Sequence, residues 1–333
     1  MRVTRLAPSP TGALHLGNAR TFLANWLLAR QSGWRVLLRV EDLDGPRIKA
    51  GADRQAMEDL RWLGIDWDDG PIYQSARIQL YSDAIERLLS AGYAYPCVCS
   101  RREVELAASA PHAEDGAAVY PGTCRGRFKS VAEARDAMGR GPAVRFALPP
   151  GVIHFNDEFS GPHSIDVSKR LGDFVIAKSE TAPAELGDPA ARAQWAHAYQ
   201  LAVVVDDAAV GVTDVVRGDD LLDSTPRQML LYEALALAGK TPRYYHLPLV
   251  VGPDGRRLAK RHGDTRLSFY RDRGVPPGRV LSLLARWCGV DVPAGASDPG
   301  PVLRTLLDRF RLGTMPKSAI TFTNDDDTWL RAG

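Results

Sequence analysis

The stretch Arg5-Leu6-Ala7-Pro8-Ser9-Pro10-Thr11-Gly12-Ala13-Leu14-His15-Leu16-Gly17-Asn18 decides the fold of this chain. The pattern predicts a short buried strand from Val3 to Leu6, then an irregular loop, then an apolar-periodic helix over 18–29 that ends at Gly33. In an open α/β sheet, such a loop forms an anion site where it meets the helix N-terminus, at the carboxyl end of the first strand. The spacing fits neither GxxxxGK[ST] nor GxGxxG, so the common nucleotide-binding loops are excluded.

The composition is that of a globular enzyme. The 333 residues are 45% hydrophobic, enough for a sizeable core and more than one compact unit. A net charge of +2 neither requires nor excludes a nucleic-acid partner. We find no signal peptide and no run of about eighteen apolar residues, and therefore expect a cytoplasmic protein with no membrane partner. Its four cysteines are expected to be reduced thiols.

Carboxylates follow the second predicted strand. This strand, Arg35 to Val40, runs directly into Glu41-Asp42-Leu43-Asp44. Acidic residues at a strand end are as often turn formers as binding groups, so the local sequence leaves both roles open for them. Helices are predicted over 52–63 and 76–91, each closed by a glycine, and we expect them to cover a parallel sheet.

Three cysteines predict a metal site in the segment that begins at Tyr93. Cys97 and Cys99 form a Cys-x-Cys pair, and Cys124 follows downstream. Thiolates that gather in a reducing compartment most often bind zinc. The fourth ligand stays open: the usual zinc ligands favour His112, and water is another alternative. The competing interpretation of the cluster is buried, inert thiols. Short strands are expected nearby, over 144–148, 152–155 and 174–177.

The apolar run from Ala198 to Asp207 is predicted to be a parallel strand buried on both faces, which returns the chain to the main sheet. Val212 to Arg217 is predicted to be the next strand, so Tyr199 and Arg217 should lie near the working edge. A guanidinium suits bidentate binding of a carboxylate, although a lone strand-end arginine is more often a surface ion pair. Further helices are predicted over 224–237, 280–288 and 302–312, and a strand over 244–251.

Two motifs carry a resemblance to a known family. Pro8-Ser9-Pro10-Thr11-Gly12 followed by His15-Leu16-Gly17-Asn18 resembles the "HIGH" signature of class I aminoacyl-tRNA synthetases, in the form used by the glutamyl branch. Arg257-Leu258-Ala259-Lys260-Arg261 resembles the second signature of that class, the "KMSKS" loop. Two positions depart from the pattern: Arg257 replaces the first lysine, and Ala259 replaces a serine that could bind phosphate. The resemblance runs from residue 1 to about residue 270.

The resemblance implies an α/β fold: a Rossmann-type parallel sheet, an inserted zinc-bearing α+β domain and a short C-terminal helical stem. The boundaries expected are 1–92 and 186–255 for the two halves of the catalytic domain and 93–185 for the insertion. Residues 256–333 are expected to hold the KMSKS-like loop and the stem, with no anticodon-binding domain.

The resemblance also implies roles for single residues. Glutamate is expected to contact Arg5, Ser9, Glu41, Tyr199 and Arg217. Among these residues, the resemblance implies that Glu41 binds the amino group of glutamate and that Arg217, with help from Arg5, binds its side-chain carboxylate. ATP is expected to contact His15, Gly17, Asn18 and Lys260, with His15 and Lys260 as the catalytic residues. One structural zinc ion is expected on Cys97, Cys99, Tyr120 and Cys124. Asp42 and Asp44 are left as turn and structural residues.

Within the family, the chain resembles the short glutamyl-queuosine branch in length and in its Cys-x-Cys…Tyr…Cys arrangement. That resemblance implies that L-glutamate is activated with ATP and Mg²⁺ without tRNA, then passed to queuosine at the wobble position of tRNA(Asp). No protein nucleophile is needed for this chemistry. The alternatives are a minimal glutamyl-tRNA synthetase that charges the tRNA 3′ end, a HIGH-superfamily nucleotidylyltransferase that uses no tRNA, and a non-catalytic RNA-binding module. We expect a monomer.

Overall fold

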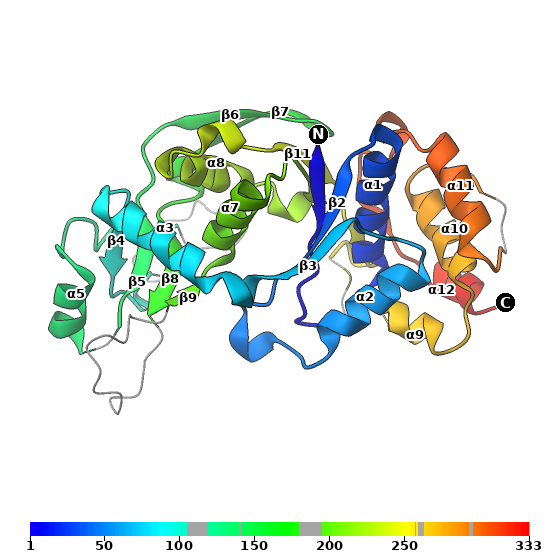
Figure 1. Ribbon diagram of the computed structural model, residues 1–333, viewed down its shortest axis with the longest axis horizontal. Coiled ribbons are helices and arrows are strands. Elements are labelled where there is room, and N and C mark those ends of the chain that lie inside the picture. Colours follow the sequence, from blue (N-terminus) through cyan, green and yellow to red (C-terminus); the bar gives the residue numbers. More distant parts are fainter. Residues whose placement is uncertain are drawn as a thin grey trace.

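The computed structural model describes residues 1–332 except 101, 105–118, 140, 180–194, 257, 259–262 and 293–295. Its N-terminal part confirms the predicted strand, loop and helix (Figure 1). β1 spans Val3–Leu6, α1 spans Leu16–Ser32 and β2 spans Arg35–Val40. β3, at Asp69–Tyr73, completes a parallel sheet in the order β1-β2-β3.

A second pair of parallel strands lies on the other side of β1. β10, at Asp214–Gly218, pairs in parallel with β11, at Arg243–Leu247. β10 packs against β1, where the backbone N–H of Thr213 donates to the carbonyl oxygen of Val3 at 2.9 Å. β1 therefore lies between β2 and β10. In an open α/β sheet, a crevice forms at the carboxyl ends of the strands where the strand order reverses, with later strands added on both sides of a central strand. Ligands bind in this crevice.

The sequence explains where α1 begins and ends. His15 is the N-cap: its Nδ1 accepts hydrogen bonds from the backbone N–H groups of Gly17, at 3.1 Å, and Asn18, at 3.4 Å. The Asn18 side chain accepts from the His15 backbone N–H in return, which completes a capping box. Gly33 ends the helix with φ of 67°, a left-handed conformation that glycine adopts at little cost.

One predicted strand is wrong. Ala198 to Asp207 does not form a strand, because this run lies almost wholly in the helix α7, at Tyr199–Val210. The run is apolar because α7 is buried on several sides: it packs against α3 (Ile78–Ser90), α8 (Ser224–Ala234) and β8 (Phe174–Ser179). A continuous apolar run does not distinguish a buried helix from a strand that is buried on both faces.

The chain between β3 and β10 adds an antiparallel sheet and a hairpin. The sheet has the order β4-β5-β8-β9, in which β4 spans Ala94–Cys97, β5 spans Ala143–Phe146 and β9 spans Trp195–His197. The strand predicted over 152–155 exists as β6, Val152–Asp157, but lies outside this sheet. It forms a hairpin with β7, Gly161–Asp166, and reaches β11 through the pair Asp157 and Tyr244 (Figure 1).

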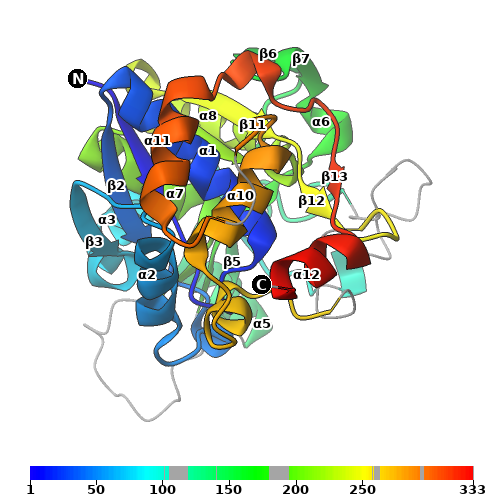
Figure 2. The same cartoon turned by 90° about the vertical axis from the view of Figure 1, so that its right-hand side faces the viewer.

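Four helices follow the second signature in the described part of the chain. α9 spans Leu267–Arg271, α10 Pro277–Trp287, α11 Pro299–Arg309 and α12 Asn324–Arg331. Two of them, α10 and α11, pack on α1, whereas α9 packs on α2, at Ala52–Trp62, and α12 on α10. The sequence predicted α10 and α11 and missed the other two. Figure 2 shows α10 and α11 beside α1. The fully buried Arg20 of α1 donates to the carbonyl oxygen of Trp287 at 3.0 Å, and α1 shares one hydrophobic core with the sheet and these helices.

The remaining elements are short. Helices α2, α5 and α6 span Ala52–Trp62, Val131–Met138 and Val167–Arg170, and β12 and β13 pair at Val250–Val251 and Ile320–Thr321. Within the described ranges, no helix is both long enough and apolar enough to span a membrane.

Replacing Leu27 by alanine should destabilise the sheet and the C-terminal helices together, because Leu27 is fully buried in their shared core. We expect a loss of about 2–5 kcal/mol in the free energy of unfolding, the range for a leucine-to-alanine change in a core. Leu80→Ala, on the exposed side of α3, is the matched control and should cost about 0.5 kcal/mol or less. Chemical denaturation followed by circular dichroism measures both. Parent-like unfolding of Leu27→Ala would contradict the shared core.

Candidate active site

Residues predicted to bind glutamate meet at the carboxyl ends of adjacent parallel strands. Arg5 lies in β1 and Arg217 lies in β10, while Glu41 directly follows the last residue of β2. Together with Ser9 and Tyr199, the first residue of α7, they line one cavity of about 500 Å³. Gly17 and Asn18 of the first signature line the same cavity, as does His15. The structure thus brings together all the predicted glutamate-binding residues and three of the four predicted to bind ATP.

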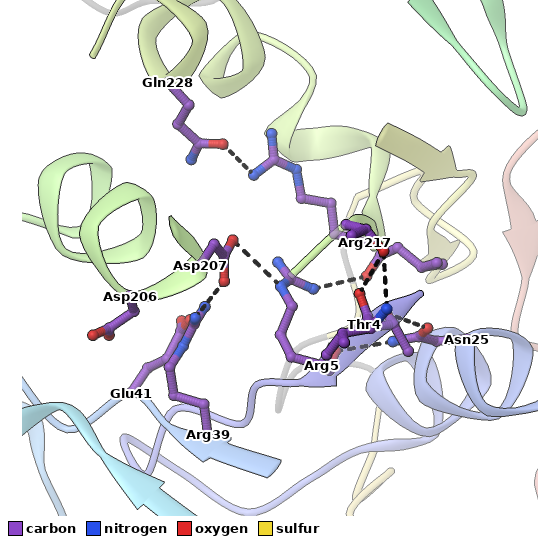
Figure 3. Close-up of polar contacts among 12 residues, drawn as sticks. Thr4, Arg5, Asn25, Arg39, Glu41, Asp206, Asp207, Arg217 and Gln228 are labelled. Atoms are coloured by element: carbon purple, nitrogen blue, oxygen red, sulfur yellow. Dashed lines mark hydrogen bonds and ion pairs between the residues drawn. The ribbon is translucent and has the colours of Figure 1, made fainter. Parts of the chain in front are cut away.

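Arg217 is a buried cation surrounded by neutral acceptors. Its Nε donates to His246 Nε2 at 2.9 Å. Its Nη1 donates to Gln228 Oε1 at 2.9 Å (Figure 3). Its Nη2 donates to Thr225 Oγ1 at 2.9 Å, and the Tyr199 hydroxyl lies 3.5 Å from Nη1. The residue is 5% exposed. No carboxylate of the described residues lies within 4.0 Å of this guanidinium, so no direct ion pair neutralises its charge.

Arg5 approaches the same cavity from β1. It is 4% exposed, and its Nη1 donates to the carbonyl oxygen of Val216 at 3.3 Å, which ties β1 to β10 (Figure 3). Its Nε lies 3.8 Å from Asp207 Oδ2 but makes no hydrogen bond with any described residue. Arg5 therefore holds a hydrogen-bond donor that the folded chain leaves unused.

Glu41 is held in place by a buried arginine. Arg39 donates to Glu41 Oε1 at 3.0 Å and pairs with Asp207 on its other side. Burial acts to lower the pKa of Arg39, but the charges of Asp207 and Glu41 outweigh it and raise the pKa, so Arg39 stays charged. The Ser9 hydroxyl donates to the Glu41 carbonyl oxygen at 3.2 Å. These contacts fix the loop after β1 against the end of β2.

The neighbours of Glu41 have structural contacts, one of them distant in sequence and one local. Asp42 accepts a hydrogen bond from the backbone N–H of Ser75 at 2.8 Å, and Asp44 pairs with Arg47 three residues on. Neither residue lines the cavity.

The N-terminus of α1 is already capped. Because the backbone N–H groups of Gly17 and Asn18 donate to His15 Nδ1, they are used within the helix, whereas the sequence led us to expect an open anion site. The Nδ1 atom must carry a lone pair to accept them, so the proton of the neutral ring is on Nε2. An anion that bound these N–H groups would have to displace the ring.

The first signature is joined to the chain that follows the second. The backbone N–H of Leu16 donates to the Thr265 carbonyl oxygen at 3.0 Å, and that of Leu267 donates to Leu14 at 2.8 Å. A second cavity, of about 990 Å³, lies between these segments and the start of α2, and His15 lines both cavities. Lys260, Arg257 and Ala259 lie outside the described residues, whereas Leu258 between them is buried in the main core.

The three predicted thiol ligands form a cluster. The sulfur atoms of Cys97, Cys99 and Cys124 all lie within 4.8 Å of one another, and none forms a disulfide. The Tyr120 hydroxyl lies 3.3 Å from Cys97 Sγ and 3.5 Å from Cys99 Sγ. A tetrahedral zinc ion with bonds of about 2.3 Å needs sulfurs about 3.8 Å apart. The sulfurs of Cys99 and Cys124 are 3.5 Å apart, so the spacing of the cluster is compatible with a metal ion. His112 lies outside the described residues.

The sequence analysis missed the partners that position these groups. Arg145 of β5 donates to Cys97 Sγ at 3.2 Å, and its guanidinium carbon stacks 3.8 Å from the centre of the Tyr120 ring. Thr225 and Gln228 of α8 hold Arg217, and His246 of β11 lies directly beside it in the strand register. The adjacent parallel strands were a usable signal for His246, because paired strands place such residues side by side.

The fold and the cavity define the class of protein. The chain belongs to the class I aminoacyl-tRNA synthetases of the glutamyl and glutaminyl type, since the family model "tRNA synthetases class I (E and Q), catalytic domain" matches residues 2–295. It is therefore an enzyme with glutamate–tRNA-ligase-like activity. The family implies ATP, glutamate and tRNA as its partners.

Relatives with similar sequences over nearly the whole chain carry two names. The chain is 46% identical to a glutamyl-Q tRNA(Asp) synthetase from Symbiobacterium thermophilum, over 99% of this chain and 98% of that protein. It is 46% identical to a protein of the same name from Rhodopirellula baltica, over 92% of each. A glutamate–tRNA ligase from Citrifermentans bemidjiense is 39% identical over 98% of this chain and 65% of the ligase.

A solved structure agrees with this assignment. A glutamate tRNA ligase from Elizabethkingia meningosepticum, crystallised in complex with its amino acid, matches the chain with a TM-score of 0.77 and 26% identity. The match covers 99% of this chain and 68% of that ligase. The class I synthetase fold expected from the two signatures is thus confirmed.

Proposed function

We propose that this enzyme activates L-glutamate with ATP, without tRNA, and then transfers the glutamyl group to queuosine at the wobble position of tRNA(Asp). The observation that carries the first half is the buried guanidinium of Arg217, which lies in a cavity without a carboxylate partner among the described residues. The names of the relatives at 46% identity support the second half.

The cavity has the charges that glutamate requires. The side-chain carboxylate pairs with Arg217, and Arg5, which lines the same cavity, adds a second positive charge. The ammonium group pairs with Glu41, whose position is fixed by Arg39. The hydroxyl groups of Ser9 and Tyr199 complete the polar lining. A ligand with one cationic and two anionic groups therefore finds a partner for two of them, and its α-carboxylate is left for the reaction.

Activation then joins this carboxylate to the α-phosphorus of ATP, and pyrophosphate leaves. His15 and the start of α1, at Gly17 and Asn18, hold the phosphates, and Lys260 stabilises the negative charge that builds up on the leaving group. Mg²⁺ accompanies ATP and offsets its phosphate charge. Since the carboxylate of glutamate is itself the nucleophile, positioning and charge stabilisation are enough for the reaction.

The acceptor is a hydroxyl of an unpaired base. Bases in single-stranded loops are the parts of RNA that proteins read most readily, because they can be splayed out and stacked. A 3′-end acceptor is the alternative, supported by the 39% identity to a glutamate–tRNA ligase.

The cysteine cluster binds one structural zinc ion on this proposal. Cys97, Cys99, Cys124 and the Tyr120 hydroxyl supply four ligand atoms, so no position is left open for chemistry. When bound, the ion cross-links the end of β4 to the chain around Cys124. None of its ligands lines the glutamate cavity.

The position of the transferred glutamate tests the proposed acceptor. With labelled glutamate and ATP, the enzyme should label tRNA(Asp) that contains queuosine, and ribonuclease digestion should recover the label in the anticodon fragment. The same tRNA without its 3′-terminal adenosine should accept glutamate equally well. Label on the terminal nucleotide, or transfer to tRNA that lacks queuosine, would establish the 3′-end alternative instead.

Replacing Arg217 by alanine should raise the KM for glutamate in ATP–pyrophosphate exchange by roughly 10²-fold, the scale of losing a buried charge-assisted pair. The parent should prefer glutamate to glutamine, because an amide leaves the guanidinium only partly paired, and the variant should lose this preference. Arg35→Ala, at the far end of β2 with an exposed ion pair to Asp69, is the control. An unchanged KM for glutamate in Arg217→Ala would assign the carboxylate to another group.

Replacing Cys99 by serine should release the zinc ion and weaken glutamate transfer to tRNA more than it weakens pyrophosphate exchange. The reason is that the cluster lies outside the glutamate cavity, so its loss loosens the inserted segment and leaves the parallel sheet folded. Metal analysis of the purified protein beside both assays measures this. Cys288→Ala, a buried cysteine outside the cluster, should keep the metal. A parent protein without zinc would refute the site.

A further inference from the structure

The β6–β7 hairpin ends at a carboxylate that is fully occupied by hydrogen bonds. Asp157, the last residue of β6, is 1% exposed. Its Oδ1 accepts from the backbone N–H groups of Phe159, at 3.0 Å, and Ser160, at 2.8 Å, within the hairpin turn. Its Oδ2 lies 2.7 Å from His246 Nδ1 and accepts from the His246 backbone N–H at 3.1 Å. Asp157 therefore anchors the hairpin to β11 at the place where His246 lies.

The contacts of His246 fix its tautomer. The Nε of an arginine can only donate, so the 2.9 Å contact between Arg217 Nε and His246 Nε2 requires a lone pair on Nε2. The proton of the neutral ring is then on Nδ1, from which it is donated to Asp157. A continuous chain of hydrogen bonds results, from Asp157 through the imidazole of His246 to the guanidinium of Arg217.

We propose that His246 and Asp157 are positioning residues that fix the plane of the Arg217 guanidinium for the side-chain carboxylate of the substrate. The proposal rests on the function proposed for Arg217 above. Three neutral atoms hold the group: His246 Nε2 at Nε, Gln228 Oε1 at Nη1 and Thr225 Oγ1 at Nη2. Three anchors at the three nitrogens of a planar group define its orientation.

The imidazole also solves an electrostatic problem. A carboxylate placed directly on Arg217 Nε would orient the guanidinium equally well, but it would neutralise the charge and compete with the substrate. Asp157 acts one imidazole ring further away. It orients His246, which presents a neutral acceptor to Arg217. The cation is thereby held in place while its charge remains available to an incoming anion.

We call the chain of hydrogen bonds from Asp157 through His246 to Arg217 the relay. It requires a neutral His246 ring. Protonation would make both ring nitrogens donors, so Arg217 Nε would lose its acceptor and face a second cation. The charged and titratable groups facing the ring are Asp157 and His163 from the hairpin, Arg217 from β10 and Tyr244 on its own strand. Burial lowers the pKa of His246 below its ordinary value, and the hydrogen bond to Asp157 only partly opposes this. Affinity for glutamate should therefore be constant near neutral pH and fall at acidic pH.

Two substitutions separate the ends of the relay. His246→Asn places an amide near the Nδ1 position, where it can still donate to Asp157 but cannot reach Arg217. His246→Gln places an amide oxygen near the Nε2 position, where it can accept from Arg217. In ATP–pyrophosphate exchange, His246→Asn should raise the KM for glutamate by at least about tenfold, and His246→Gln by only about threefold or less. The KM for ATP should not change in either variant. His154→Gln, an exposed histidine of the same hairpin, is the matched control.

The pH profile supplies a readout that a merely structural role would not change. The acidic fall in 1/KM for glutamate that titrates with His246 in the parent should be absent in His246→Gln, because no ring remains to be protonated. Equal KM values for the Asn and Gln variants, or an unchanged acidic limb in His246→Gln, would overturn the relay.

The tautomer can be measured without any substitution. Correlation of ring protons with ring ¹⁵N nuclei in the parent protein should show His246 protonated on Nδ1 and unprotonated on Nε2, and the signal is assigned by its loss in His246→Gln. A proton on Nε2 would overturn the proposal even if His246→Asn failed to fold. If Arg217→Ala leaves the KM for glutamate unchanged, the carboxylate-binding role proposed above for Arg217 fails. If Arg217→Ala raises it and the His246 variants do not, only the relay fails.

Discussion

Burial of arginine charge at the carboxyl ends of the parallel strands is the constraint on which the site depends. A buried cation costs several kcal/mol unless its charge or its hydrogen bonds are compensated. Arg39 and Arg217 are buried alike, yet they are compensated in opposite ways. Arg39 forms ion pairs with two carboxylates, Asp207 and Glu41, which balance its positive charge. Arg217 has only neutral acceptors among the described residues and keeps its charge. The first arrangement builds the wall of the cavity, and the second is suited to bind an anion within it.

One of the compensating groups, Asp207, comes from α7, which supplies buried carboxylates to two sides of the helix. Asp206 and Asp207 are consecutive and buried, and they serve different neighbours. Asp206 accepts from Gln74 and Tyr81 on the side of α3, and Asp207 pairs with Arg39 on the side of the sheet. Consecutive residues on a helix point about 100° apart, so one helix can supply both sides. The same helix begins at Tyr199 and thus also borders the cavity.

Predictions from sequence succeeded where the information is local. Periodicity with glycine and proline breaks located β1, α1 and β2, and the two signatures identified the fold. Prediction from periodicity failed for α7, because burial on several sides removes the polar stripe that marks a helix. Pairings between distant residues could not be predicted: Arg39 and Asp207 are 168 positions apart, and Asp157 and His246 are 89. No local pattern shows which of these side chains meet. The pairing of β6 with β11 could not be predicted for the same reason, since it depends on contacts of Asp157 and Glu158 with Tyr244 and His246, far along the chain.

The cap of α1 links the two signatures in a way that bears on the proposed chemistry. His15 Nδ1 occupies the N–H groups of Gly17 and Asn18, which are the groups that would bind a phosphate. On the proposed function, an incoming phosphate and the His15 ring compete for the same donors, so binding of ATP requires the ring to turn away from the helix. His15 is bridged to Arg266, and Leu14 and Leu16 are hydrogen-bonded to the same segment. A rotation of the His15 ring would therefore take place at a residue whose backbone and both neighbours are joined to the segment that follows the second signature.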